Sequence, residues 1–181
     1  MKCPRCPSRP TLRRTREPLE LMSHECPDCH GRWLRSDSYW RWVAKGNAPD
    51  AAATELRPAR ADDARGIRFC PEDGYVLAPY SVGDPLAFAV DQCRTCSGVW
   101  FDGGEWESLL EHGLAARLDD ILSEDWQDEL REAHDERRET QQWRRQLGDD
   151  LERIQEIKTW LDLHPKRSEL YAFLRIHERV V

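Results

Sequence analysis

The sequence predicts two tandem zinc-stabilised β ribbons, each a β-hairpin with a short helix, followed by an α-helical arm. Three observations lead to this fold class. One unit is repeated at an offset of 67 residues, all seven cysteines lie within that repeat, and the C-terminal region is polar with helical spacing of its apolar residues. Self-similarity at a fixed period indicates one small module that is used more than once.

Two stretches with the same skeleton define the repeat. CPDCHGRWL starts at Cys26 and CRTCSGVWF starts at Cys93, so Cys-x-x-Cys-x-Gly-x-Trp recurs 67 positions later. The same offset takes Cys3 to Cys70, and a proline follows each of these cysteines. The chain therefore contains two copies of one unit.

The cysteine spacing favours metal binding over disulfides. The chain begins MKCPRCPSRP, without the apolar segment of a secretory signal, which predicts a reducing, cytoplasmic location. Paired Cys-x-x-Cys motifs form tetrahedral zinc sites, and no βαβ pattern of a thioredoxin-like protein surrounds them. We predict two zinc ions per chain, with the ligand positions Cys3, Cys6, Cys26 and Cys29 in one unit and Cys70, Asp73, Cys93 and Cys96 in the other.

The one position without sulfur is Asp73, which aligns with Cys6. A carboxylate is an acceptable zinc ligand, so a site of three cysteines and one aspartate is one interpretation. The alternative is that Asp73 and Gly74 form only a turn and leave the fourth position to water. Both interpretations predict that the second site binds zinc more weakly than the all-cysteine site.

Each repeat is predicted to contain a β-hairpin. Apolar runs on both sides of Gly83-Asp84-Pro85 predict a hairpin in the second unit, and a shorter alternating segment predicts one in the first. Units this small depend on metal binding for their folding energy.

Composition divides the chain into four predicted parts. These are a first ribbon (1–45), a linker rich in alanine, proline and charged residues (46–66), a second ribbon with an attached helix (67–118), and a charged helical arm (119–181).

Structural roles account for the residues after Cys96. We expect Gly98 to permit the turn that brings backbone amides to the thiolates. Trp100 and Phe101 are expected to form a strand over the metal. Asp102 and Glu105 have the spacing of a capping box at the start of a helix.

These motifs resemble the small bacterial zinc-finger domain family named for transcription factor IIB. The second unit matches through CSGVWFDGGEW, and the first through CPRC and CPDCHGRWL, after which it departs with RSDSYW. The resemblance covers about half of the chain. It implies a zinc-binding domain with a suggested link to transcription, in which such ribbons often dock on protein partners, including RNA polymerase.

Our functional prediction is a non-enzymatic, cytoplasmic adaptor that docks a protein partner. One alternative is nucleic-acid binding through Arg9, Arg13, Arg14 and Arg16, with Trp40 or Trp42 stacking on bases. A less favoured alternative is a zinc hydrolase or deaminase at the second site, because Cys70-Pro71-Glu72 followed by Cys93 and Cys96 echoes the deaminase signature. Gln92 stands where that signature has proline, and the net charge of −7 argues against strong nucleic-acid binding.

The C-terminal region is expected to contain one long helix from about residue 123 to 163 and a short one from 168 to 179. No run of apolar residues is long enough to span a membrane. The long helix carries an apolar stripe that is too narrow for a core of its own, so it either folds back within the chain or forms a homo-oligomer or partner interface. The stripe consists of Leu147, Leu151, Ile154, Ile157 and Leu161.

Overall fold

The structure is a computed structural model that describes residues 1–16, 21–46, 66–83 and 86–177. It divides into two compact units, residues 1–134 and the remainder from Asp135 onward. Both repeats lie in the first unit. No helix in the described ranges is long and apolar enough to cross a lipid bilayer.

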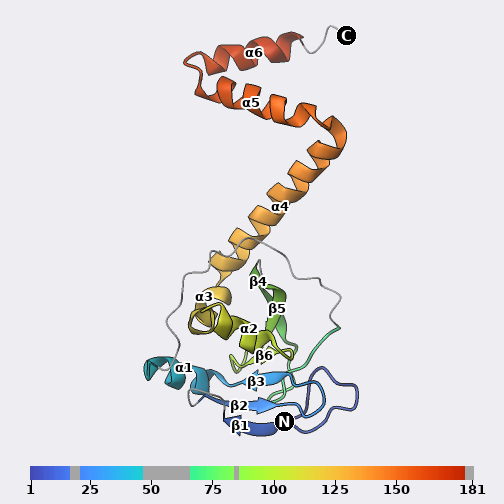
Figure 1. The fold of residues 1–181 in the computed structure, drawn as a ribbon, viewed down its shortest axis with the longest axis vertical. Helices are drawn as coiled ribbons and strands as arrows, with labels where there is room; N and C mark the ends of the chain where they lie inside the picture. Colours follow the sequence, from blue (N-terminus) through green and yellow to red (C-terminus); the bar gives the residue numbers. More distant parts are fainter. Residues whose placement is uncertain (17–20, 47–65, 84–85, 178–181) are drawn as a thin grey trace. The chain divides into compact units, whose positions relative to one another are not determined.

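A single six-stranded antiparallel sheet joins the two repeats (Figure 1). Its strand order is β1-β2-β3-β6-β5-β4, so the three strands of one repeat lie beside the three strands of the other. The strands of the first repeat are β1 (Arg13–Arg16), β2 (Met22–Glu25) and β3 (Arg32–Leu34). Those of the second are β4 (Ala78–Gly83), β5 (Leu86–Gln92) and β6 (Val99–Phe101).

The junction between β3 and β6 has approximate two-fold symmetry. Trp33 lies opposite Trp100 in the register, and these are equivalent residues of the two repeats. The flanking pairs, Arg32 with Phe101 and Leu34 with Val99, exchange under the same 67-residue offset. The chain is therefore built like a dimer of two related units, with the approximate two-fold axis passing between the two tryptophans.

Helices cover one face of this sheet. Alternate residues of a strand point to opposite faces, so Leu34 and Phe101 face the helices while their neighbours Trp33 and Trp100 face away. The helices are α1 (Ser36–Ala44), α2 (Glu105–Glu111) and α3 (Leu118–Ile121), with a 3₁₀ turn at Ala115–Arg117. The predicted placement of Phe101 over the metal is thus wrong, because it belongs to the opposite face from Trp100.

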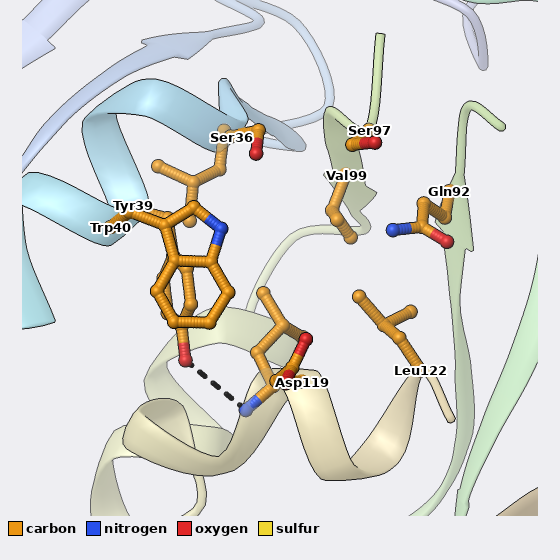
Figure 2. Close-up of a pocket in the computed structure, with 10 residues that line it drawn as sticks. Ser36, Tyr39, Trp40, Gln92, Ser97, Val99, Asp119 and Leu122 are labelled. Carbon is orange, nitrogen blue, oxygen red and sulfur yellow. Dashed lines mark hydrogen bonds between the residues drawn. The ribbon is translucent and has the colours of Figure 1, made fainter. Parts of the chain in front are cut away.

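Aromatic side chains hold α1 and α2 together, although they come from different repeats. The rings of Trp42 and Trp106 are 5.7 Å apart between centroids, in an edge-to-face arrangement. The buried Tyr39 hydroxyl accepts a hydrogen bond of 3.2 Å from the Leu118 backbone N–H (Figure 2). Removal from water raises the pKa of Tyr39 to about 12, so this phenol stays protonated at neutral pH.

The start of α2 differs from the expected capping box. Gly104 precedes the helix in the left-handed region, with φ of 88°, and no side chain caps the first turn. The Glu105 carboxylate accepts from the Asp102 backbone N–H at 2.8 Å, which is half of the expected pair. The other half is absent because the Asp102 carboxylate accepts from Trp100 and Arg68 instead.

Both predicted hairpins are present. β1 pairs with β2, and β4 pairs with β5, with Gly83 opposite Leu86 at the end of the ladder. Two parts of the predicted turns and linker, residues 84–85 and 47–65, lie outside the described residues. The linker prediction is therefore not tested.

The C-terminal helices are α4 (Glu124–Leu147), α5 (Asp150–Leu163) and α6 (Arg167–His177). The expected continuous helix from 123 to 163 is interrupted at Gly148, whose φ of 54° ends α4 with a left-handed turn. The second compact unit also begins later than residue 119, at Asp135. Ile121 is fully buried and Trp126 packs against the core of the first unit, so the start of α4 belongs there.

Candidate metal centres

The first cluster consists of four thiols, Cys3, Cys6, Cys26 and Cys29, with all ligand atoms within 4.8 Å of one another. The Sγ atoms of Cys3 and Cys29 are 3.7 Å apart, and those of Cys6 and Cys26 are 3.9 Å apart. A tetrahedral zinc ion with Zn–S bonds of about 2.3 Å places its sulfurs about 3.8 Å apart. These two distances match the edges of a zinc tetrahedron, and all four sulfurs are close enough to share one ion.

Backbone turns set this geometry in the same way in both repeats. The Cys26 N–H donates to the Gly31 carbonyl at 2.8 Å, and the Cys93 N–H donates to Gly98 at 2.9 Å. The turns close through left-handed residues at equivalent positions, His30 with φ of 56° and Ser97 with φ of 57°. In these turns the left-handed conformation falls on the residue before each glycine.

The second cluster consists of Cys70, Asp73, Cys93 and Cys96, again within 4.8 Å of one another. The Sγ atoms of Cys70 and Cys96 are 3.6 Å apart. An Asp73 carboxylate oxygen, Oδ2, lies 3.2 Å from Cys93 Sγ, close to the spacing of two ligands on one zinc ion. The structure thus brings all four predicted positions together.

Asp73 combines the two roles that the sequence left as alternatives. Its Oδ1 atom accepts a hydrogen bond of 3.1 Å from the Tyr75 backbone N–H, as in an Asx turn. Its other oxygen points at the thiols. This turn is also shorter than its counterpart, because Phe69 bridges to Val76 whereas Lys2 bridges to Thr11. The offset between repeats is therefore 65 residues at this point rather than 67.

The protonation of the clusters differs between the two sites. Burial raises the pKa of Cys3 to about 11, and burial together with neighbouring thiols raises the pKa of Cys6 further. For Cys26, desolvation raises the pKa, but hydrogen bonds from the Cys29 and Asp28 backbone N–H groups outweigh it and lower the pKa. At the second site desolvation raises the pKa of Cys70 and of Cys96. For Asp73, desolvation raises the pKa, but hydrogen bonds from Cys70 and the Tyr75 N–H outweigh it and lower the pKa. Three cysteines with an already ionised carboxylate therefore form the second site.

The glycine of the Cys-x-x-Cys-x-Gly-x-Trp motif in each repeat packs against the tryptophan of the other repeat. These contacts lie on the face of the sheet that carries the cysteine clusters. A Cβ at Gly98 would lie 2.3 Å from Cζ2 of Trp33, and a Cβ at Gly31 would lie 2.2 Å from Cζ2 of Trp100. These glycines therefore leave space for the tryptophan across the junction. The Gly98 backbone N–H does hydrogen-bond to Cys96, as expected of this turn, but the left-handed conformation belongs to Ser97, so the space for Trp33 is what requires glycine here.

A buried ion network beside the second site was not predicted. Arg68 donates to Asp91 at 2.5 Å and to Asp102 at 2.9 Å, and all three side chains are largely buried. Burial raises the pKa of Asp102, but hydrogen bonds from Trp100 and Arg68 outweigh it and hold the pKa below its ordinary value. Neither spacing nor periodicity indicated these contacts, because Arg68 and Asp102 lie far apart in the sequence.

The arginines proposed for nucleic acid do not share one face. Arg13 and Arg14 are adjacent in β1 and therefore point to opposite faces of the sheet, and all four arginines are exposed. Trp42 is buried in the core, so it is not available for stacking on a base, whereas Trp40 is half exposed. The residues in question are Arg9, Arg13, Arg14 and Arg16.

A shallow pocket lies beside Trp40, between α1, the sheet and α3 (Figure 2). Ser36, Ser97 and Gln92 supply polar groups, and Asp119 is the one carboxylate among its ten lining residues. The lining contains no cysteine or histidine. This set of side chains supplies no paired acid and base and no metal-binding group.

Together the fold and the ligand atoms define a zinc-binding protein with two zinc sites per chain. Comparison with protein families agrees for the second repeat. Residues 69–112 match the family described as transcription factor zinc-finger. The matched segment is less than half of the chain, and the first repeat lies outside it. No curated protein and no solved structure matches the chain.

Proposed function

We propose that the protein is a non-catalytic zinc-ribbon module that docks a protein partner through the second repeat. Two tandem ribbons form the module, and zinc stabilises their shape. The family match supports a partner among the proteins of transcription. Ligation by reduced thiols favours a reducing compartment such as the cytoplasm, and none of the seven cysteines is in a disulfide.

An exposed apolar surface beside the second zinc site carries this proposal. Four large apolar residues lie around the Phe69–Val76 bridge with exposed fractions of 47% for Phe69, 57% for Val76, 62% for Tyr75 and 77% for Ile67. We call these four residues the apolar knuckle. Contiguous exposed apolar side chains favour a protein interface.

The first repeat shows that the fold does not require apolar residues there. At the bridge that corresponds to Phe69–Val76 it has Lys2 and Thr11, and the Lys2 ammonium donates to the Thr11 hydroxyl at 2.9 Å. One backbone arrangement therefore accepts either a polar or an apolar pair. The apolar pair is best explained by a partner with an apolar surface.

The contacts of Glu72 support a non-catalytic role at the second site. A deaminase-like mechanism needs this carboxylate to move protons at a metal-bound water. Glu72 instead accepts from the Trp33 indole N–H at 3.1 Å and lies 3.2 Å from the Arg35 guanidinium. Both partners come from the first repeat, so Glu72 links the two repeats through these contacts.

The first repeat supplies the substitutions for a test. Phe69→Lys with Val76→Thr gives the apolar knuckle the polar pair of the other repeat, while Lys2→Phe with Thr11→Val is the matched control. Affinity purification from native lysate, followed by reconstitution with the purified partner, measures binding. We expect binding to be lost with the first variant and kept with the control, with two zinc ions retained in both. Equal binding by the two variants would refute the proposal.

The helical arm supports a second proposal, self-association. In α5 the side chains of Ile154, Ile157 and Trp160 are spaced three residues apart and are about half exposed. The first half of α5 has a net negative charge, with Asp150, Glu152 and Glu156 against Arg153. The stretch from Lys158 to Arg167, which runs past the end of α5, has a net positive charge, with Lys158, Lys166 and Arg167 against Asp162. An antiparallel second copy would cover the apolar residues and place opposite charges together.

A further inference from the structure

Equivalent positions of the two repeats carry opposite charges at the junction. With the 67-residue offset, Arg5 corresponds to Glu72 and Arg35 corresponds to Asp102. The first repeat therefore has an arginine at both positions, and the second has a carboxylate at both. Neither difference is explained by zinc, because none of the four residues is among the ligands.

These four side chains form two ion pairs across the junction. The Arg35 Nε atom is 3.2 Å from Glu72 Oε1, and the Arg5 Nε atom is 3.8 Å from Asp102 Oδ1. The two contacts are equivalent under the pseudo-two-fold axis between β3 and β6. Each contact joins the first repeat to the second, and each is attractive because the charges are reversed.

The same carboxylates also accept hydrogen bonds from the two tryptophans that flank the axis. The Trp33 indole N–H donates to Glu72 at 3.1 Å, and the Trp100 indole N–H donates to Asp102 at 2.9 Å. Both tryptophans are fully buried, so each indole N–H needs an acceptor. Arginine has donors and no acceptor, so the first repeat supplies no equivalent group.

We infer that this charge reversal determines which repeats pair: a first repeat fits a second repeat, and neither fits another copy of itself. Two first repeats would bring Arg5 against Arg35 twice and would remove the acceptors of both indoles. Two second repeats would bring Glu72 against Asp102 twice, with only the Arg68 of each repeat beside Asp102 to offset the repulsion. The backbone symmetry of the junction permits all three pairings, and the charges favour only the unlike one.

Specificity here depends on a difference between pairings rather than on strong attraction. The two arginines are about half exposed, so each ion pair contributes little to stability by itself. A like pairing loses two attractive contacts and gains two repulsive ones, which is a larger change. The effect falls with ionic strength because the charges are near the surface.

The full-length chain with zinc can be given the charge pattern of a like pairing. Arg5→Glu with Arg35→Glu makes all four positions acidic, as in two second repeats. Arg14→Glu with Arg94→Glu is a control with the same net charge, since both side chains are exposed and neither forms an ion pair with another described residue. Chemical denaturation at low and high salt then measures the folded-to-unfolded ratio, and metal analysis confirms zinc content.

We expect the Arg5, Arg35 variant to have a folded-to-unfolded ratio about tenfold below that of the control at low salt, and closer to it at high salt. Arg5→Gln with Arg35→Gln should lie between them, and this neutral variant serves if the acidic one does not fold. Equal stability of the acidic variant and its control at low salt would overturn the inference.

A second measurement separates charge from a structural role of Glu72. Glu72→Gln keeps an acceptor for Trp33 but removes the charge. In the natural sequence this substitution should lower stability, whereas in the Arg35→Glu background it should raise it. The same sign in both backgrounds would show that Glu72 serves only as a hydrogen-bond acceptor and would likewise overturn the inference.

Discussion

Trp33 and Trp100 lie opposite each other in β3 and β6, and each ring occupies the space above a glycine of the other repeat. Both rings are fully buried beside the cysteine clusters. The two zinc sites are thus parts of one folded unit, because the tryptophan of each repeat packs against the glycine of the other repeat's metal-binding motif. A change at either glycine is expected to affect both repeats.

Gly98→Ala should therefore destabilise the whole first unit. The added Cβ would meet the Trp33 ring at 2.3 Å, and the surrounding core would have to shift, at a cost of about 1–3 kcal/mol in the free energy of unfolding. Gly66→Ala is the matched control, because the space around Gly66 is open. Chemical denaturation of both zinc-loaded variants measures the difference, and equal stability would contradict the interpretation of this glycine.

The two zinc sites should differ in their retention of metal. Metal analysis of the native protein should give two zinc ions per chain, and gentle chelation should empty the site with Asp73 first, because thiolates bind zinc more tightly than a carboxylate does. Substituting Cys70 or Cys3 identifies which site each loss belongs to. Simultaneous loss from both sites in the native protein would contradict the ranking.

Asp73→Cys and Asp73→Asn separate the two roles of this residue. Cysteine supplies a fourth thiolate and should increase zinc retention at the second site. Asparagine keeps the oxygen that accepts from the Tyr75 N–H but lacks the negative charge, so zinc retention should decrease. If Asp73→Cys weakened retention while Asp73→Asn left it unchanged, the turn would be the main role of this position.

Zinc retention should depend more steeply on pH at the first site than at the second. All four ligand positions there are thiols, and burial raises the pKa of Cys3 to about 11, although hydrogen bonds outweigh desolvation and lower the pKa of Cys26, so protons compete with the metal in the neutral range. At the second site the pKa of Asp73 is lowered, so its carboxylate is already ionised and only three thiols release protons. Affinity should therefore rise with pH at both sites.

Proton release on zinc uptake checks this sign directly. A pH indicator in weak buffer near pH 7 should report more protons released per zinc at the first site than at the second, and Asp73→Cys should remove the difference. Equal release at the two sites of the natural sequence would show that Asp73 is protonated before zinc binds or that it does not take part.

Self-association through the arm should depend on the exposed residues of α5. Ile157→Glu with Trp160→Glu places two charges in that surface and should lower the mass in light scattering to that of one chain. Gln141→Glu with Gln142→Glu adds the same charge on the exposed surface of α4 and should leave the mass unchanged. Leu151 is a poor choice for this test because it is buried within the arm. A natural sequence that is monomeric at all concentrations would refute the proposal.

The two clusters could be predicted from the sequence alone. Cys-x-x-Cys pairs and a 67-residue offset are local features, and zinc coordination restricts their geometry so strongly that spacing was enough to predict the eight residues that the structure brings together in two groups. The hairpins followed from apolar runs around turn residues. The interruption of the long helix at Gly148 could have been found, because glycine often ends a helix in a left-handed turn.

How the two repeats combine could not be predicted from the sequence. The pairing of β3 with β6 joins residues 67 positions apart, and no local pattern reports such a register. The fit of Trp33 over Gly98 and the ion pairs of Arg5 and Arg35 with the second repeat exist only after that pairing. The repeat shows that the two units are alike. It does not show which of their residues touch, because those contacts join residues that are far apart in the sequence.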